Sequence, residues 1–220
     1  MKKSAILGYL LLLTVGFFYL RGNAVSLGEV KTKTETISKN ENIVFLGDSI
    51  FDWYPTDKIF SDLPIVNSGI VGNKTTDVLK DMDRRVYQYN PTKVFINIGT
   101  NDIEWEDSEE LNEEVFQNIV KIVEGIQKNR KNSEIYIISI YPVNNNFQGP
   151  NERHNSEIKS INKRLKKYCA TAKGVEYVDA YKELVNQDDM LDEDYTTDGL
   201  HPNGLGYAKI TEILMKYIYE

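Results

Sequence analysis

From residue 42 onward, short apolar runs alternate regularly with longer segments of helical periodicity. Five runs are rich in β-branched and aromatic residues and are apolar on both faces, as buried parallel strands are. These predicted strands cover residues 42–46, 64–67, 93–98, 134–140 and 175–178. Segments with apolar residues at spacings of three and four predict helices over residues 75–89, 108–128, 152–171 and 204–219. The alternation predicts an α/β fold with one parallel five-stranded sheet, covered by helices on both faces.

The charge and the cysteine content exclude several classes of function. The 220 residues include 26 Lys or Arg and 33 Asp or Glu, which gives a formal net charge of −7. Because phosphate binding needs a basic surface, we expect no nucleic-acid partner. A single cysteine, Cys169, excludes an internal disulfide framework and a Cys-based zinc cluster. With only two histidines, His154 and His201, we expect neither a metal ion nor another cofactor.

Residues 1–24 have the pattern of an export segment. Lys2 and Lys3 precede an apolar run over residues 5–20, and no acidic residue occurs before Glu29. A cleaved signal peptide and an uncleaved membrane anchor both fit, and both place the rest of the chain outside the cytoplasm. Residues 25–40 are polar and non-periodic, which predicts a linker before a single domain over residues 41–220. Because that domain is acidic, we expect membrane contact only through the N-terminal segment.

Polar and glycine-rich blocks stand where the predicted strands end. They are Gly47-Asp48-Ser49-Ile50, Gly72-Asn73, Gly99-Thr100-Asn101-Asp102 and, before the last helix, Asp198-Gly199-Leu200-His201-Pro202. In open parallel sheets, ligands bind beyond the carboxyl ends of the strands. We therefore expect the four blocks to meet at one edge of the sheet.

The residues in these blocks are those that acyl transfer requires. A serine hydroxyl such as Ser49 is a weak nucleophile until a base takes its proton, and His201 is the candidate base. Asp198, three residues earlier, can orient the imidazole from within a tight turn. The oxyanion needs preorganised donors, for which we predict the backbone N–H of Gly72, the side-chain amide of Asn101 and the N–H of Ser49 itself.

The order and spacing of the four blocks resemble those of the SGNH (GDSL-type) hydrolases, from about residue 42 to the C-terminus. The positions that carry over are Ser49, Gly72, Asn101 and His201, with Asp198 as the third triad member and Ile50 where the family name has Leu. The resemblance implies a flavodoxin-like three-layer α/β/α fold and ester hydrolysis without a metal ion.

Other conspicuous residues have structural interpretations. We expect Asp48 and Asp102 to brace their loops, since a carboxylate beside the nucleophile would work against an oxyanion. Trp53 and Tyr54 could line a pocket or pack the short helix after Ser49. We expect Cys169 to be a small apolar residue of the core.

We expect a serine esterase that acts outside the cytoplasm on a small-molecule or glycan ester. Residues 41–220 leave no room for a long hydrophobic lid, and the loop over residues 141–151 is rich in asparagine and suited to hydroxyl groups. These features favour short acyl groups, with acetyl on a carbohydrate or cell-surface glycan as the prediction. Three alternatives stay open: a lysophospholipase or thioesterase with a longer acyl channel, a glycan O-acetyltransferase, and a tethered glycan-binding protein with an inactive site.

Overall fold

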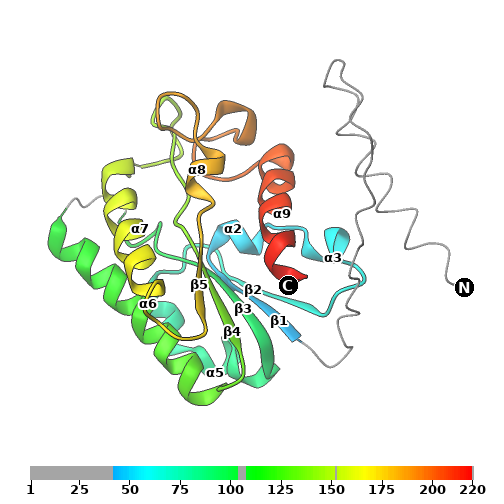
Figure 1. The fold of residues 1–220 in the computed structure, drawn as a ribbon. Coiled ribbons are helices and arrows are strands. Elements are labelled where there is room, and N and C mark those ends of the chain that lie inside the picture. Colours follow the sequence, from blue (N-terminus) through cyan, green and yellow to red (C-terminus); the bar gives the residue numbers. More distant parts are fainter. Residues whose placement is uncertain (1–41, 104–107, 152, 220) are drawn as a thin grey trace, which may run out of the picture. The chain divides into compact units, whose positions relative to one another are not determined.

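The computed structural model describes residues 42–103, 108–151 and 153–219 (Figure 1). The strands are β1 (Asn42–Gly47), β2 (Ile65–Gly69), β3 (Pro91–Asn97), β4 (Glu134–Ile138) and β5 (Val175–Val178). The helices are α2 (Ser49–Asp52), α3 (Thr56–Ile59), α4 (Thr75–Lys80), α5 (Met82–Arg85), α6 (Glu109–Asn129), α7 (Asn155–Cys169), α8 (Tyr181–Leu184) and α9 (Gly204–Ile218), with 3-10 turns η1 (Tyr87–Tyr89) and η2 (Glu193–Tyr195). The predicted export segment 1–24 and linker 25–40 lie outside the described residues. Within the described ranges, no helix is long and apolar enough to cross a membrane.

The five strands form one parallel sheet in the order β2-β1-β3-β4-β5. This is the flavodoxin-like order, so the predicted fold class is confirmed. At the carboxyl ends of the central strands, Gly47 of β1 pairs with Gly69 of β2 on one side and with Asn97 of β3 on the other. The loops that follow these three strands therefore start next to one another.

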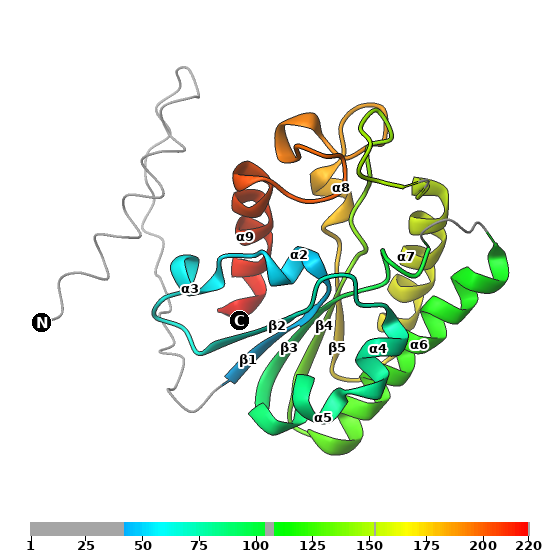
Figure 2. The same cartoon turned by 180° about the vertical axis from the view of Figure 1, so that it is seen from behind.

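Alternate side chains of each strand enter separate cores, one on each face of the sheet. Val44 and Leu46 of β1 contribute to the core under α4, α5, α6 and α7, whereas Ile43 and Phe45 contribute to the core under α2, α3, α8 and α9. Figures 1 and 2 show these two groups of helices on opposite faces of the sheet. The architecture is a three-layer α/β/α fold, as expected from strands that are apolar on both faces.

The longest described helix, α6, shows why a helix could be predicted from the spacing of apolar residues. Its N-cap Ser108 accepts a hydrogen bond from the Leu111 N–H, and Glu109 and Glu110 lie in the first turn, where acidic side chains favour the helix dipole. The residues at the predicted spacing, among them Val115 and Ile122, are buried against the sheet. The capping residue and the buried apolar residues therefore both support a helix over this segment.

The predicted single helix over residues 75–89 is wrong in detail, because the chain forms α4, α5 and η1 there. The break falls at Asp81, whose backbone leaves the helical region and whose carboxylate pairs with Arg84. Aspartate is a poor interior helix residue because its side chain competes for nearby backbone groups. The change of direction brings Arg85 to the ends of β1 and β2, where it donates to the carbonyl oxygens of Gly47 and Ser68.

Candidate active site

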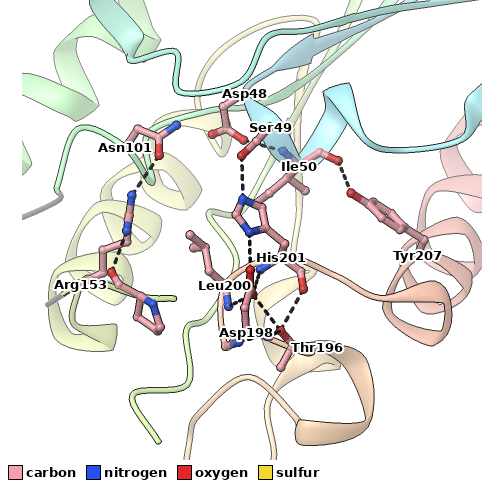
Figure 3. A network of polar contacts seen from close by, with 12 residues as sticks. Asp48, Ser49, Ile50, Asn101, Arg153, Thr196, Asp198, Leu200, His201 and Tyr207 are labelled. Atoms are coloured by element: carbon pink, nitrogen blue, oxygen red, sulfur yellow. Dashed lines mark hydrogen bonds and ion pairs between the residues drawn. The ribbon is translucent and has the colours of Figure 1, made fainter. Parts of the chain in front are cut away.

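The structure brings the four predicted blocks together at the carboxyl edge of the sheet. Ser49 begins α2 directly after β1, Gly72 follows β2, and Asn101 follows β3. Asp198 and His201 lie in the loop that precedes α9. Figure 3 shows the side chains of Ser49, His201 and Asp198 in one line, with that of Asn101 to one side.

Ser49, His201 and Asp198 form one continuous hydrogen-bonded chain. The Oγ of Ser49 lies 3.0 Å from Nε2 of His201, and Nδ1 of the same ring lies 2.7 Å from Oδ2 of Asp198. Ser49 is 5% exposed, so its hydroxyl is largely screened from bulk water. This is the spatial arrangement of a nucleophile, a base and an orienting carboxylate.

The partners of the ring nitrogens define the tautomer of His201. A carboxylate only accepts, so Nδ1 carries the proton that it donates to Asp198. Nε2 is then left with a lone pair toward the Ser49 hydroxyl, as a general base requires. Burial raises the pKa of the Asp198 carboxyl, but hydrogen bonds from His201 and Leu200 outweigh that effect and hold it below its ordinary value. Asp198 is therefore an ionised acceptor around neutral pH.

A compact turn holds Asp198 against the ring. Oδ1 of Asp198 accepts the backbone N–H groups of Leu200 and His201 at 2.9 and 2.8 Å, which leaves Oδ2 for the imidazole. Gly199 has a φ of +84°, and a Cβ placed there would lie 2.4 Å from the carbonyl oxygen of Asn144. Only glycine fits at position 199, which explains why a glycine follows Asp198 directly.

Asp48 braces the nucleophile loop, as predicted. It is the N-cap of α2 and accepts the Ile50 N–H through Oδ1 at 3.0 Å. Its Oδ2 is buried without a hydrogen-bond partner. Burial raises the pKa of this carboxyl to about 7, with the Ile50 hydrogen bond opposing the shift. A protonated Asp48 removes the like charge that would otherwise oppose an oxyanion at Ser49.

The two predicted oxyanion donors come from the loops after β2 and β3. Gly72 is the third residue of a turn closed by the Asn73 N–H on the Ile70 carbonyl, and its φ of +74° is the left-handed value that a type II turn needs there. A Cβ at Gly72 would meet no atom within 4 Å, so the peptide is open to an approaching ligand. The Nδ2 of Asn101 donates to the Asn73 carbonyl at 3.1 Å, which links the two loops.

Asp102 also acts as a brace, in agreement with its predicted structural role. Its carboxylate accepts the Thr75 N–H at the start of α4 and lies 2.5 Å from the Thr75 hydroxyl. The Thr75 hydroxyl in turn accepts from Nδ2 of Asn118 on α6. Burial raises the pKa of Asp102 to about 6, with the Thr75 hydrogen bonds opposing it.

The two aromatic residues after Ser49 differ in role. Tyr54 belongs to the core and its hydroxyl lies 2.6 Å from the Thr211 hydroxyl. Trp53 is 49% exposed, and its ring centroid lies 4.3 Å from that of His201. Trp53 therefore covers one side of the imidazole, whereas Tyr54 packs the fold. Cys169 is buried, as predicted, and His154 is exposed.

The asparagine-rich loop over residues 141–151 is less available to a ligand than its composition suggests. Asn144 is fully buried and donates to the Leu191 carbonyl at 2.8 Å. Asn145 donates to the Arg153 carbonyl at 3.1 Å. These two amides hold the loop in place, and because Asn145 and Asn146 are exposed, hydroxyl binding by this loop stays a prediction.

Two buried arginines beside the site could not be predicted from the sequence. Arg85 donates to Oδ1 of Asn73, which holds the Gly72 loop, and Arg153 donates to Oδ1 of Asn101. Both lie in helical or helix-start patterns, where an arginine is expected to be exposed. The spacing of residues along the sequence therefore does not indicate that these two arginines are buried.

Among residues 42–103, 108–151 and 153–219, no group of three or more His, Cys, Asp or Glu side chains could hold a metal ion. The sequence has two acidic runs, over residues 104–110 and 188–194, and residues 104–107 of the first lie outside the described ranges. In the second run, Asp189 pairs with Lys159.

Fold and site together define a hydrolase of the SGNH type. The model of the GDSL-like Lipase/Acylhydrolase family matches residues 45–209, which span all four blocks. Platelet-activating factor acetylhydrolase IB subunit alpha2 from Homo sapiens is 27% identical over 187 residues, covering 83% of this chain and 78% of that protein.

Solved structures give the same result. A structure from Streptococcus pneumoniae, described as a platelet activating factor, is 31% identical with a TM-score of 0.76 and covers 85% of this chain and 87% of its own. A GDSL-like lipase from Bacteroides thetaiotaomicron is 26% identical with a TM-score of 0.72 and covers 83% of this chain and 89% of its own. The chain belongs to the GDSL-like lipase/acylhydrolase family and is a carboxylic ester hydrolase.

Proposed function

We propose that the protein is a serine esterase that cleaves short acyl esters, with acetyl esters as the preferred substrates. The observation that carries the proposal is the continuous chain from Ser49 through His201 to Asp198. In the first step, Nε2 of His201 takes the hydroxyl proton while Oγ of Ser49 attacks the ester carbonyl carbon. The bond to the alcohol oxygen then breaks, and the alcohol leaves with the proton from Nε2.

The second half of the reaction uses the same groups in reverse. Water donates a proton to Nε2 and attacks the acyl-Ser49 carbonyl, after which the acid leaves and Ser49 recovers its proton. In both halves the Gly72 and Asn101 donors, with the Ser49 N–H, stabilise the oxyanion. Asp198 stays ionised and stabilises the imidazolium.

Two observations support a short acyl group. The relative from Homo sapiens carries the word acetylhydrolase in its name. Among the described residues, the short connection from β2 to α4 (residues 70–74) also contains no helix that could serve as a lid. The alcohol half of the substrate, a carbohydrate or cell-surface glycan, stays a prediction from the sequence.

A second candidate, a lysophospholipase or thioesterase for longer acyl chains, is favoured by the surface around the site. Trp53, Ile70, Val71 and Leu205 are large apolar side chains that are between 43% and 63% exposed. Each lies within four residues of Ser49, Gly72 or His201 in the sequence. An exposed apolar border next to a nucleophile could bind an acyl chain.

A chain-length series separates the two candidates. We expect kcat/KM on p-nitrophenyl esters of two to twelve carbons to be highest at two to four carbons, and to vanish at every length in Ser49→Ala. A maximum beyond about eight carbons that falls in Val71→Ser, with acetate ester turnover unchanged, would establish the long-chain candidate. Product analysis with a glycan acceptor present separates hydrolysis from acetyl transfer, because free acetate forms only in hydrolysis.

We also propose that the enzyme acts outside the cytoplasm, on the basis of Lys2, Lys3 and the apolar run over residues 5–20. Protease added to intact cells should digest the full chain if it is anchored. A cleaved chain should appear in the medium with a new N-terminus near residue 24. A chain that remains in the cytosolic fraction with Met1 intact would contradict the proposal.

A further inference from the structure

Arg153, one of the largest buried side chains of the described residues, lies beside the site. It is 2% exposed and comes just before His154, the N-cap of α7. Burying a charged side chain is costly unless its polar atoms are satisfied, and arginine is almost never fully buried without partners. The partners of Arg153 therefore indicate what its burial maintains.

The guanidinium donates in three directions toward the loop after β3 and its neighbour. Nε donates to the Thr100 carbonyl at 2.7 Å, Nη1 donates to the Pro150 carbonyl at 2.7 Å, and Nη2 donates to Oδ1 of Asn101 at 3.0 Å. Two of these contacts fall on the Thr100-Asn101 pair. Figure 3 shows the amide oxygen of Asn101 turned toward Arg153 and its nitrogen turned away.

These contacts leave one orientation for the Asn101 amide. A guanidinium only donates, so the group that faces Arg153 must be the carbonyl oxygen of the amide. The group on the other side faces the Asn73 carbonyl, which only accepts, so it must be the NH₂. One N–H of that NH₂ is used by Asn73, and the second is available for an oxyanion. A flipped amide would present an acceptor to the oxyanion and would lose both contacts.

We propose that Arg153 is a positioning residue of the esterase, which fixes the Asn101 amide so that its N–H donates to the oxyanion. The inference rests on the proposed role of Asn101 as an oxyanion donor. Preorganised donors are effective because they need no reorientation during the reaction. The same guanidinium opposes the rise in the pKa of Asp48 that burial causes, so its charge reaches the nucleophile loop as well.

A double-mutant cycle with Asn101 tests the proposal. In the full chain, Arg153→Met should lower kcat for p-nitrophenyl acetate by about 10- to 100-fold with KM changed less than about twofold. In an Asn101→Ala background, the same Arg153→Met substitution should lower kcat by less than about threefold, because the amide that it positions is gone. Arg164→Met, which removes a surface arginine paired with Glu109 and Glu113, is the matched control and should keep wild-type kcat.

The outcomes distinguish the inference from the proposed function. If Asn101→Ala keeps wild-type kcat, the oxyanion assignment itself fails. If Asn101→Ala is slow and Arg153→Met is equally harmful in both backgrounds, only the role of Arg153 is overturned. A loss expressed wholly in KM would likewise overturn it.

A second variant and a measurement on the unmodified enzyme cover the case in which Arg153→Met does not fold. Arg153→Lys keeps the charge but not the fork of donors, so it should show the same dependence on Asn101. In the wild-type enzyme, the Asn101 side-chain NH₂ should have an NMR order parameter close to that of rigid backbone, which is about 0.85. A value below about 0.6 would show a rotating amide and would overturn the proposal.

Discussion

The buried carboxyl of Asp48 makes the stability of the protein depend on pH in a way that one substitution should remove. Burial raises its pKa from the ordinary 3.8 to about 7. Below the ordinary value both the folded and the unfolded chain hold the proton, and the group costs nothing. Between the two values the folded chain alone keeps the proton, so the free energy of unfolding falls by about 1.4 kcal/mol per pH unit.

The size of this pKa shift sets how much the free energy of unfolding changes with pH. At pH 5 the carboxyl of Asp48 costs about 1.5 kcal/mol, and above pH 7 the cost levels off at about 4 kcal/mol. Asp48→Asn keeps an oxygen that can accept the Ile50 N–H but cannot ionise. Relative to the wild type, the variant should therefore gain about 2 to 3 kcal/mol in the free energy of unfolding between pH 5 and pH 8.

Urea unfolding at pH 5 and pH 8 measures the difference directly. Asp52→Asn is the matched control, because Asp52 is exposed on the same short helix, and the gap between the two pH values should stay at its wild-type size. If Asp48→Asn and the wild type shift in parallel to within about 0.5 kcal/mol, burial does not raise the pKa of Asp48 and the reasoning is refuted.

Three further predictions follow from the site and the core. Asn101→Ala should lower kcat by about 100- to 1000-fold, with some loss of thermal stability because the buried Arg153 loses an acceptor, and unchanged turnover would remove Asn101 from the site. Asp198→Asn should favour the wrong tautomer of His201 and lower kcat by about 10⁴-fold, as measured by steady-state kinetics, whereas near-normal turnover would contradict the orienting role of the carboxylate. Burial raises the pKa of the Cys169 thiol to about 12, so labelling with a disulfide reagent should be slow in the native protein and fast in urea, and rapid native labelling would contradict that environment.

Much of the fold could be predicted from the sequence because its strands are short, apolar on both faces and separated by glycine-containing loops. The pairing of Gly47 with Gly69 and Asn97 depends on the tertiary structure. That ligands bind beyond the carboxyl ends of parallel strands was nevertheless enough to predict that the blocks after these strands meet. Ser49, Asp198 and His201 lie in local motifs, so their proximity could be expected before the structure was known.

The supporting residues could not be predicted in the same way. Arg153 reaches Thr100 across 53 positions in the sequence, and Arg85 reaches Gly47 across 38. Their burial depends on carbonyl oxygens whose positions exist only in the folded sheet. The break at Asp81 has only a weak local signal, an aspartate within a helical pattern, whereas the contact of Arg85 with Gly47 that it permits is tertiary.

The proposed mechanism makes Ser49 the nucleophile and His201 the base that activates it. The most direct measurement is mass spectrometry of the full chain after brief incubation with a fluorophosphonate and, separately, with p-nitrophenyl acetate. The mechanism predicts one covalent adduct, on the peptide that contains Ser49. The adduct should be absent in Ser49→Ala and should form much more slowly in His201→Ala. Ester turnover that continues in Ser49→Ala, or an adduct on another residue, would contradict it.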